Sequence, residues 1–260
     1  MINYGMYLAF RDAKADIAGK EIALVLDSGG GKTDAAYRIA RLFQRKAKSF
    51  TVVVPRFAKS AATLLSLGAE EIILGEDADL GPLDAQIMDY DHEETWVSAL
   101  DTVQAVEQLE DSAIEVASRM LKYLQLHTKK RYSMLLEPSL HFAATVTKPL
   151  FKKIDAVSYS RRSRMLKEAE DYAVRLLMSK FSESEAELLA RDLVKRYSTH
   201  GFVIDSEECK RLGASLDENE TRKYVGLHAS APKTPDLAKA VDDLYNAVSS
   251  GTALGKLVPI

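Results

Sequence analysis

Cysteine is almost absent from this sequence, which has one, Cys209, among 260 residues. A single cysteine excludes an intrachain disulfide and a zinc site built from several thiolates, and it fits a reducing compartment. Cys209 stands in a polar stretch with no histidine nearby, so nothing there indicates an activated nucleophile. The histidines have no metal-ligand spacing, and we therefore expect neither a metal ion nor a cofactor.

Long hydrophobic runs and a strong excess of one charge are also missing. No apolar run reaches the ~18 residues that a membrane-spanning helix needs. The first charged residue comes at Arg11, so we expect neither a signal peptide nor a membrane span. The net charge of −3 is too small to indicate nucleic-acid binding. These absences predict a cytoplasmic protein.

The first ninety residues alternate short apolar runs with helical patterns. Three runs have the length and composition of buried strands, namely Ile22–Leu26, Phe50–Val54 and Glu71–Leu74. Between them, helical patterns run from about Thr33 and over Ala58–Leu67. Strands that alternate with helices predict a mostly parallel sheet with right-handed crossovers.

After residue 97 the pattern becomes helical. We expect helices at about 98–126, 133–150, 160–180, 184–197, 206–212 and 235–248. The polar, turn-like stretch at residues 88–97 marks the predicted boundary. The sequence therefore predicts an α/β core over residues 1–97 and a helical extension over residues 98–260.

A glycine cluster, Asp27-Ser-Gly-Gly-Gly31, follows the first predicted strand. Such a turn can hold the phosphates of a nucleotide or the oxyanion formed in peptide hydrolysis. Gly31-Lys-Thr33 matches the end of a phosphate-binding loop, but the first glycine of that motif would fall at Leu26, inside the strand. No dinucleotide-binding fingerprint follows a strand either. The phosphate alternative therefore depends on three residues.

The oxyanion alternative needs a nucleophile at the end of the neighbouring strand, and Ser60 follows the second predicted strand. Ser60 opens a predicted helix, where backbone N–H groups point at one spot. A serine at a helix start is also a common N-cap, so the position alone does not decide between the two roles.

Four segments together resemble the serine dehydrogenase proteinase family, a relative of signal peptide peptidase A with the Clp/crotonase fold. The matching segments are the glycine turn, Ala58-x-Ser-x-x-Thr-Leu64, Leu80-Gly-Pro-x-Asp-x-Gln86, and Thr199-His200 followed by Leu212-Gly213. The resemblance implies a Clp/crotonase-like core flanked by helices and a homo-oligomer. It covers about residues 20–213.

The resemblance implies that Ser60 is the nucleophile and that backbone N–H groups of Gly30, Gly31 and Ala61 form the oxyanion hole. Many relatives have Ser-Gly-Gly where this chain has Ser60-Ala61-Ala62. Alanine keeps its N–H, so the hole survives, although the backbone has less freedom.

A serine nucleophile needs a general base, and relatives of signal peptide peptidase A use a lysine for it. No lysine lies between Ser60 and Lys122, and Lys122 falls where some relatives also have one. At helical spacing Lys122 shares a face with polar residues, which is also typical of a solvent-exposed lysine. Asp84 can orient a base or cap a turn, and His200 can approach the serine or form a structural turn. Lys59 adjoins Ser60, but neighbouring side chains diverge.

The sequence therefore predicts a serine peptidase that acts on a peptide or protein, with Ser60 as nucleophile and Lys122 as base. The alternative is a non-catalytic binding or scaffold protein of the same fold, which the lysine gap and the alanine pair favour.

Overall fold

The structure, a computed structural model, describes residues 1–84, 86–89, 95–216 and 222–249. The chain forms two compact units, Met1–Ala85 together with Leu166–Ile260, and Gln86–Met165. The boundary predicted between residues 97 and 98 falls inside the second unit. Residues 90–94 of the predicted boundary segment lie outside the described residues.

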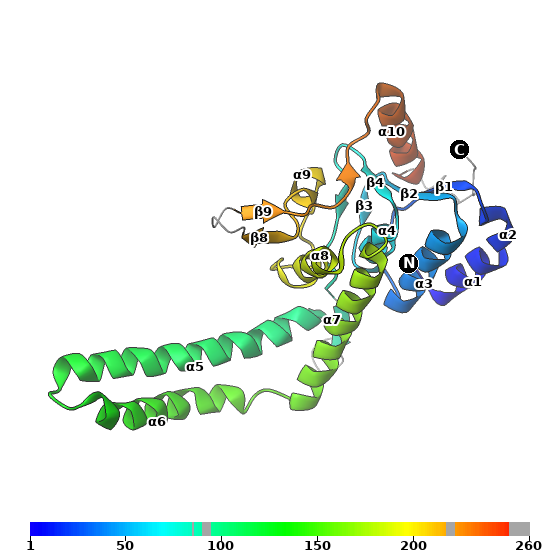
Figure 1. The fold of residues 1–260 in the computed structure, drawn as a ribbon. Helices are drawn as coiled ribbons and strands as arrows, with labels where there is room; N and C mark the ends of the chain where they lie inside the picture. Colours follow the sequence, from blue (N-terminus) through cyan, green and yellow to red (C-terminus); the bar gives the residue numbers. More distant parts are fainter. Residues whose placement is uncertain (85, 90–94, 217–221, 250–260) are drawn as a thin grey trace. The chain divides into compact units, whose positions relative to one another are not determined.

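The first unit is built on a parallel sheet in the order β1-β2-β4-β10 (Figure 1). Its strands are β1 (Glu21–Val25), β2 (Ser49–Val54), β4 (Glu71–Leu74) and β10 (Ala229–Ser230). The three apolar runs form β1, β2 and β4, which confirms the predicted parallel core. Three of the four residues of β4 are buried, as expected for a strand that is covered on both faces.

Four helices lie in the N-terminal part of this unit: α1 (Tyr4–Asp12), α2 (Lys14–Ile17), α3 (Thr33–Lys46) and α4 (Ala61–Leu67). The apolar stripe predicted on α3 is confirmed, because Ala36, Ile39, Ala40 and Phe43 are all fully buried. The Phe43 ring stacks on Phe50 of β2 with centroids 4.7 Å apart. This contact packs α3 against the sheet.

Two short strands that the sequence did not predict lie before and after α4. These strands, β3 (Phe57–Ala58) and β5 (Asp79–Leu80), pair in parallel. The helix expected over Ala58–Leu67 therefore starts three residues later, at Ala61, because strand pairing holds the backbone of Phe57 and Ala58 extended. The two residues between the strand and the helix, Lys59 and Ser60, form the tight turn.

The remainder of the first unit comes from the C-terminal part of the chain. It holds the end of α7 (Ala156–Leu177), α8 (Glu183–Lys195), α9 (Ser206–Cys209), the hairpin β8 (Ala214–Leu216) and β9 (Arg222–Tyr224), and α10 (Pro235–Ser249). Val241 of α10 packs against Val53 and Ile73 of the sheet. Cys209 is buried in α9, and burial raises the pKa of its thiol to about 12, which fits the absence of a nucleophilic role.

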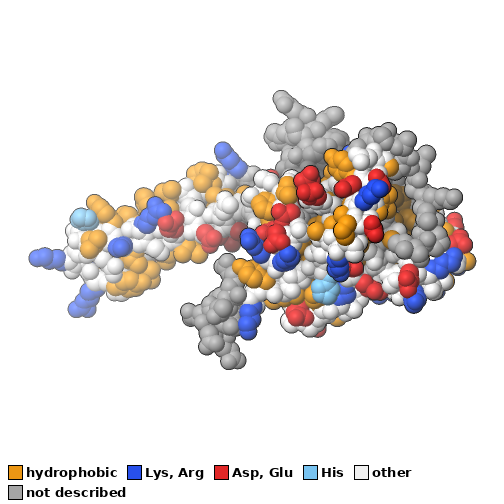
Figure 2. Space-filling view, turned by 90° about the horizontal axis from the view of Figure 1, so that it is seen from above, with side chains coloured by type: hydrophobic (Ala, Val, Ile, Leu, Met, Phe, Trp, Pro, Cys, Tyr) orange, Lys and Arg blue, Asp and Glu red, His pale blue; other side chains and the backbone are white. Residues whose placement is uncertain are grey.

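The second unit is a β-hairpin followed by long helices. β6 (Gln86–Asp89) and β7 (Thr95–Ser98) pair in antiparallel fashion, and α5 (Ala99–His127) and α6 (Tyr132–Phe151) follow with the start of α7. Several large apolar side chains of α5 and α6 are exposed, among them Ile114, Leu126 and Phe142, and such side chains are orange in Figure 2. Within the described residues, no helix is both long and apolar enough to cross a membrane.

Candidate active site

The glycine turn that follows β1 is held against the segment before Ser60. The Ser28 N–H donates to the Phe57 carbonyl oxygen at 3.0 Å, and the Lys59 N–H donates to the Ser28 carbonyl oxygen at 2.9 Å. Asp27 Oδ2 accepts hydrogen bonds from the guanidinium of Arg56, with the Nε atom 3.0 Å away. These bonds bring the predicted oxyanion turn beside the predicted nucleophile.

Gly30 makes the closest approach between the two segments. Its φ is +116°, a region that side chains other than glycine rarely enter. A Cβ atom at this position would lie 3.0 Å from the Lys59 carbonyl oxygen and 3.1 Å from Ser60 Cβ. Only glycine therefore allows the turn to lie this near the serine.

Gly31 forms a parallel bridge with Ile2 of the N-terminal segment. The Ile2 N–H donates to the Gly30 carbonyl oxygen at 2.9 Å, and the Lys32 N–H donates to the Ile2 carbonyl oxygen at 2.9 Å. A Cβ on Gly31 would lie 2.1 Å from the Ile2 carbonyl oxygen. The backbone of Ile2 therefore occupies the side of Gly31 on which a side chain would stand, so only glycine fits there.

Ser60 has the most unusual backbone of the site. Its φ of 52° makes it the one non-glycine residue with positive φ among those the structure describes, and its ψ is −117°. Its side chain makes no capping hydrogen bond to α4, so the N-cap role does not explain the serine. Strained conformations of this kind persist where a sharp strand-to-helix turn presents a nucleophile.

The predicted oxyanion donors differ in their hydrogen bonds. Ala61 is the first residue of α4, where the helix itself offers no acceptor for the N–H, and none of the described residues accepts it. The Gly30 N–H already donates to Ser28 Oγ at 3.2 Å. A substrate oxygen would therefore have to replace the Ser28 hydroxyl at Gly30, whereas the Ala61 donor is available.

Thr63 fastens the Leu80–Asp84 segment to the serine turn. Its buried Oγ1 lies 2.7 Å from the Ala58 carbonyl oxygen and 2.8 Å from the Gly81 carbonyl oxygen, and it accepts the Gly81 N–H at 3.1 Å. The Gly81 N–H also donates to the Ala58 carbonyl oxygen at 3.0 Å. The threonine of the A-x-S-x-x-T-L segment thus has a structural role that the sequence reasoning missed.

Lys59 is engaged in an ion pair. Its Nζ lies 2.6 Å from Asp79 Oδ2 and also donates to the carbonyl oxygens of Leu80 and Phe202. Leu80 and Ile204 exchange both backbone hydrogen bonds, at 3.0 and 3.1 Å. These contacts place the segment after Thr199-His200 beside the Leu80–Asp84 segment.

Asp84 and His200 meet where these two segments approach each other. The Asp84 side chain is 3% exposed, and its Oδ2 lies 3.8 Å from His200 Nδ1. That distance suits an ion pair with a protonated imidazole but exceeds a hydrogen bond. His200 Nδ1 is buried, and no described residue is its hydrogen-bond partner.

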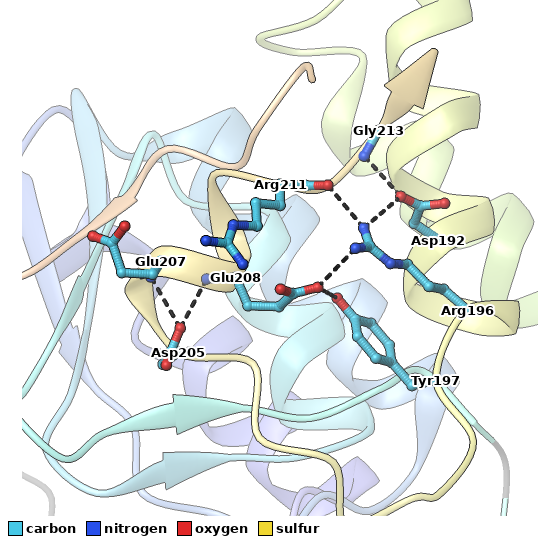
Figure 3. Close-up of polar contacts among 8 residues, drawn as sticks. All are labelled: Asp192, Arg196, Tyr197, Asp205, Glu207, Glu208, Arg211 and Gly213. Carbon is cyan, nitrogen blue, oxygen red and sulfur yellow. Dashed lines mark hydrogen bonds and ion pairs between the residues drawn. The ribbon is translucent and has the colours of Figure 1, made fainter. Parts of the chain in front are cut away.

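A charged network holds the helices that flank His200 (Figure 3). Arg196 at the end of α8 lies 3.3 Å from Asp192 and 3.1 Å from Glu208, and it donates to the Arg211 carbonyl oxygen at 2.8 Å. Tyr197 donates its hydroxyl to Glu208 at 3.0 Å. Burial raises the pKa of Tyr197, so the phenol remains a donor.

The network fixes both ends of the segment that carries His200. The Tyr197 ring packs on Phe202, with centroids 4.5 Å apart. Asp205 caps α9 by accepting the N–H groups of Glu207 and Glu208 at 3.0 and 2.8 Å. The histidine is therefore held between two anchored helices, although only the T-H motif pointed to it in the sequence.

Lys122, the predicted base, lies in the second unit. It is in the C-terminal half of α5, and its side chain is exposed. Ser60, the three oxyanion residues, Asp84 and His200 all belong to the first unit. The described residues contain no group of three or more His, Cys, Asp or Glu side chains that could hold a metal ion.

Comparisons with known proteins indicate the family of this chain. Residues 7–135 match the family described as ClpP-like SDH-type serine proteinase. Two uncharacterized proteins of Methanocaldococcus jannaschii are 28% and 26% identical over 84% and 79% of this chain. These alignments span 60% and 55% of the relatives, so the chain corresponds to somewhat more than half of each. No solved structure matches.

Proposed function

Residues 7–135 of this chain belong to the ClpP-like SDH-type serine proteinase family, and from this premise we propose that the protein hydrolyses peptide bonds with Ser60 as nucleophile. The observation that carries the proposal is the backbone of Ser60, with φ 52° and ψ −117°. A serine that neither caps its helix nor relaxes its backbone fits a reactive role better than a structural one.

In the proposed reaction, Ser60 Oγ attacks the scissile carbonyl carbon while its proton passes to the base. The carbonyl oxygen becomes an oxyanion and accepts hydrogen bonds from the backbone N–H groups of Ala61, Gly30 and Gly31. The intermediate collapses, the base returns the proton to the departing amine, and an acyl-enzyme remains. Water, activated by the same base, then releases the second product.

Two residues compete for the role of base. His200 lies in the same unit as Ser60, and Asp84 Oδ2, 3.8 Å from its Nδ1, is the carboxylate near enough to orient the imidazole. Lys122 is the base predicted from the sequence, and it lies in the other unit. His200 is supported by its place in the same unit as Ser60 and by the nearby Asp84, whereas Lys122 is supported by its position in the sequence.

The alternative function is a non-catalytic binding protein of the same fold. The Gly30 N–H that would complete an oxyanion hole is engaged by Ser28 Oγ, which favours this alternative. A peptide or protein substrate, a homo-oligomeric state and a cytoplasmic location also stay predictions.

A fluorophosphonate probe tests the proposal, because it labels activated serines. We expect the probe to label the wild-type protein and not the Ser60→Ala variant. Ser66→Ala is the matched control, because Ser66 lies on the same helix but donates to its own helix at Ala62. It should keep the label. An unlabelled, folded wild-type protein would favour the binding function.

A further inference from the structure

A cavity of about 410 Å³ lies between α1, α3 and α7, in the first unit. Five cationic side chains line it: Arg38, Arg41, Arg45, Lys46 and Arg175. No carboxylate of the described residues forms an ion pair with any of the five. Like charges around one cavity repel each other, so an anion would relieve an existing cost.

The arrangement follows from the sequence of α3. Arg38, Arg41 and Arg45 are spaced three and four residues apart, which places them along one face of the helix. Arg45 and Lys46 also lie in the last turn, where cations stabilise the helix dipole. Arg175 lies in the last turn of α7, where the same effect applies, but the effect does not account for Arg38 or Arg41.

Arg41 is the residue that a solvated basic surface does not explain. Its Nε is buried and has no hydrogen-bond partner among the described residues. Its Nη1 donates to Gln44 Oε1 at 3.0 Å. Gln44 in turn donates its amide to the Leu176 carbonyl oxygen and to Ser179 Oγ, both at 3.0 Å. The guanidinium is thus held in place with one buried donor left unused.

Three tyrosines, Tyr7, Tyr37 and Tyr172, and Leu42 supply the rest of the wall. Tyr37 and Tyr172 stack with their centroids 4.3 Å apart, and Arg38 lies 5.8 Å from the centre of the Tyr7 ring. Burial first, and then the hydrogen bond with Glu168, raise the pKa of Tyr172. Its phenol therefore stays protonated and uncharged near neutral pH.

We propose that this cavity binds a small molecule that carries an oligophosphate group. Guanidinium groups bind phosphate oxygens with two parallel hydrogen bonds, and several of them suit a ligand with several negative charges. The volume lies in the range of small-molecule pockets and is too small for a folded partner. The site is separate from the glycine turn, because its lining residues on α3 begin at Tyr37, whereas the turn precedes the first residue of α3, Thr33.

Isothermal titration of the full chain with sodium triphosphate at low ionic strength tests this proposal. We expect saturable binding and a rise of the melting temperature with triphosphate concentration. Arg41→Gln should weaken binding at least about tenfold. Arg175→Gln, which alters an exposed side chain and should leave the fold intact, should weaken it by several-fold.

Arg191→Gln is the matched control, because Arg191 is exposed on α8, outside the cavity, and the variant has the same net charge. It should bind triphosphate within about twofold of wild type. Equal weakening in Arg191→Gln and the cavity variants, or no binding at millimolar triphosphate, would overturn the proposal. A titration with ATP distinguishes a nucleotide from an inorganic oligophosphate as the ligand. If ATP binds more tightly than triphosphate, the cavity recognises a nucleotide; if the two bind equally, it recognises the phosphate chain alone. The outcome does not depend on peptidase activity.

Discussion

His200 Nδ1 and Asp84 Oδ2 lie 3.8 Å apart inside the first unit. The aspartate follows β5, and the histidine precedes the segment that bridges to β5 at Ile204. Two parts of the chain more than a hundred residues apart thus bring a carboxylate and an imidazole together in the unit that contains Ser60. Catalytic hydrogen bonds are often longer than ideal before substrate binds.

The two candidate bases give opposite results in a peptidase assay. If His200 is the base, His200→Gln lowers kcat/KM about 10²–10⁴-fold, and Lys122→Met leaves it near the wild-type value. Asp84→Asn should lower the rate as well, because the carboxylate orients the imidazole. The measurement is kcat/KM from pH 5 to pH 9. Normal activity in His200→Gln together with loss in Lys122→Met would assign the base to the lysine.

The strain at Ser60 predicts that removing its side chain stabilises the fold. Glycine adopts a positive φ at little cost, so Ser60→Gly should raise the free energy of unfolding by about 1 kcal/mol. Ser60→Ala keeps a Cβ and should not gain this stability. Urea unfolding of both variants measures the difference. If Ser60→Gly were no more stable than Ser60→Ala, the backbone of Ser60 would not be strained.

The close approach at Gly30 predicts a contrast between two adjacent glycines. Gly30→Ala should lower the free energy of unfolding by about 1–3 kcal/mol, because the new Cβ meets Lys59 and Ser60 at a positive φ. Gly29→Ala meets nothing within 4 Å, and we expect a change within about 0.5 kcal/mol. Urea unfolding compares the stability of the two variants, and fluorophosphonate labelling compares their reactive serine. Equal stability would show that the turn does not press against the serine.

Lys180 predicts a pH dependence of stability. Burial lowers the pKa of this lysine to about 8, and its ammonium donates to the Ala69 carbonyl oxygen. Between pH 8 and the ordinary lysine pKa of about 10.5, the unfolded chain binds more protons than the folded one, so this residue makes stability rise with pH. Below pH 8 its cost is fully present, on the order of 3 kcal/mol.

Lys180→Met removes that cost and the hydrogen bond to Ala69. The unfolding free energy of the variant minus that of the wild type should therefore decrease as pH rises from 7.5 to about 10.5. Urea titrations at several pH values measure it. Lys239→Met, at an exposed position on α10, should show a constant difference. A constant difference for Lys180→Met as well would disprove the linkage.

The sequence predicted the elements whose side chains repeat with a clear period. The stripe of α3 and the apolar runs of β2 and β4 are long enough to determine element type, and the structure confirms them. β3, β5 and β10 have two residues each, too few for any period. They form because tertiary neighbours accept and donate their backbone hydrogen bonds.

The site was only partly predictable for the same reason. The motifs pointed to Gly30, Ser60, Asp84 and His200, which lie in one unit. The φ of Ser60 was not predictable, because it arises from hydrogen bonds on both sides of the turn, such as the one from Lys59 to Ser28. The roles of Thr63 and Lys59 likewise depend on partners distant in sequence. The oxyanion roles and the base remain predictions.

Residues 86–165 interrupt the first unit, so β4 is made before the interruption and its neighbour β10 after it. During synthesis the ribosome releases β1, β2 and β4 with one edge of β4 unpaired. That edge stays open until the second unit and α8 have also emerged. The second unit, continuous in sequence, can be completed first. The first unit, whose first segment is made before the second unit, is therefore the last to close, and the nascent protein exposes a sheet edge to other chains until then.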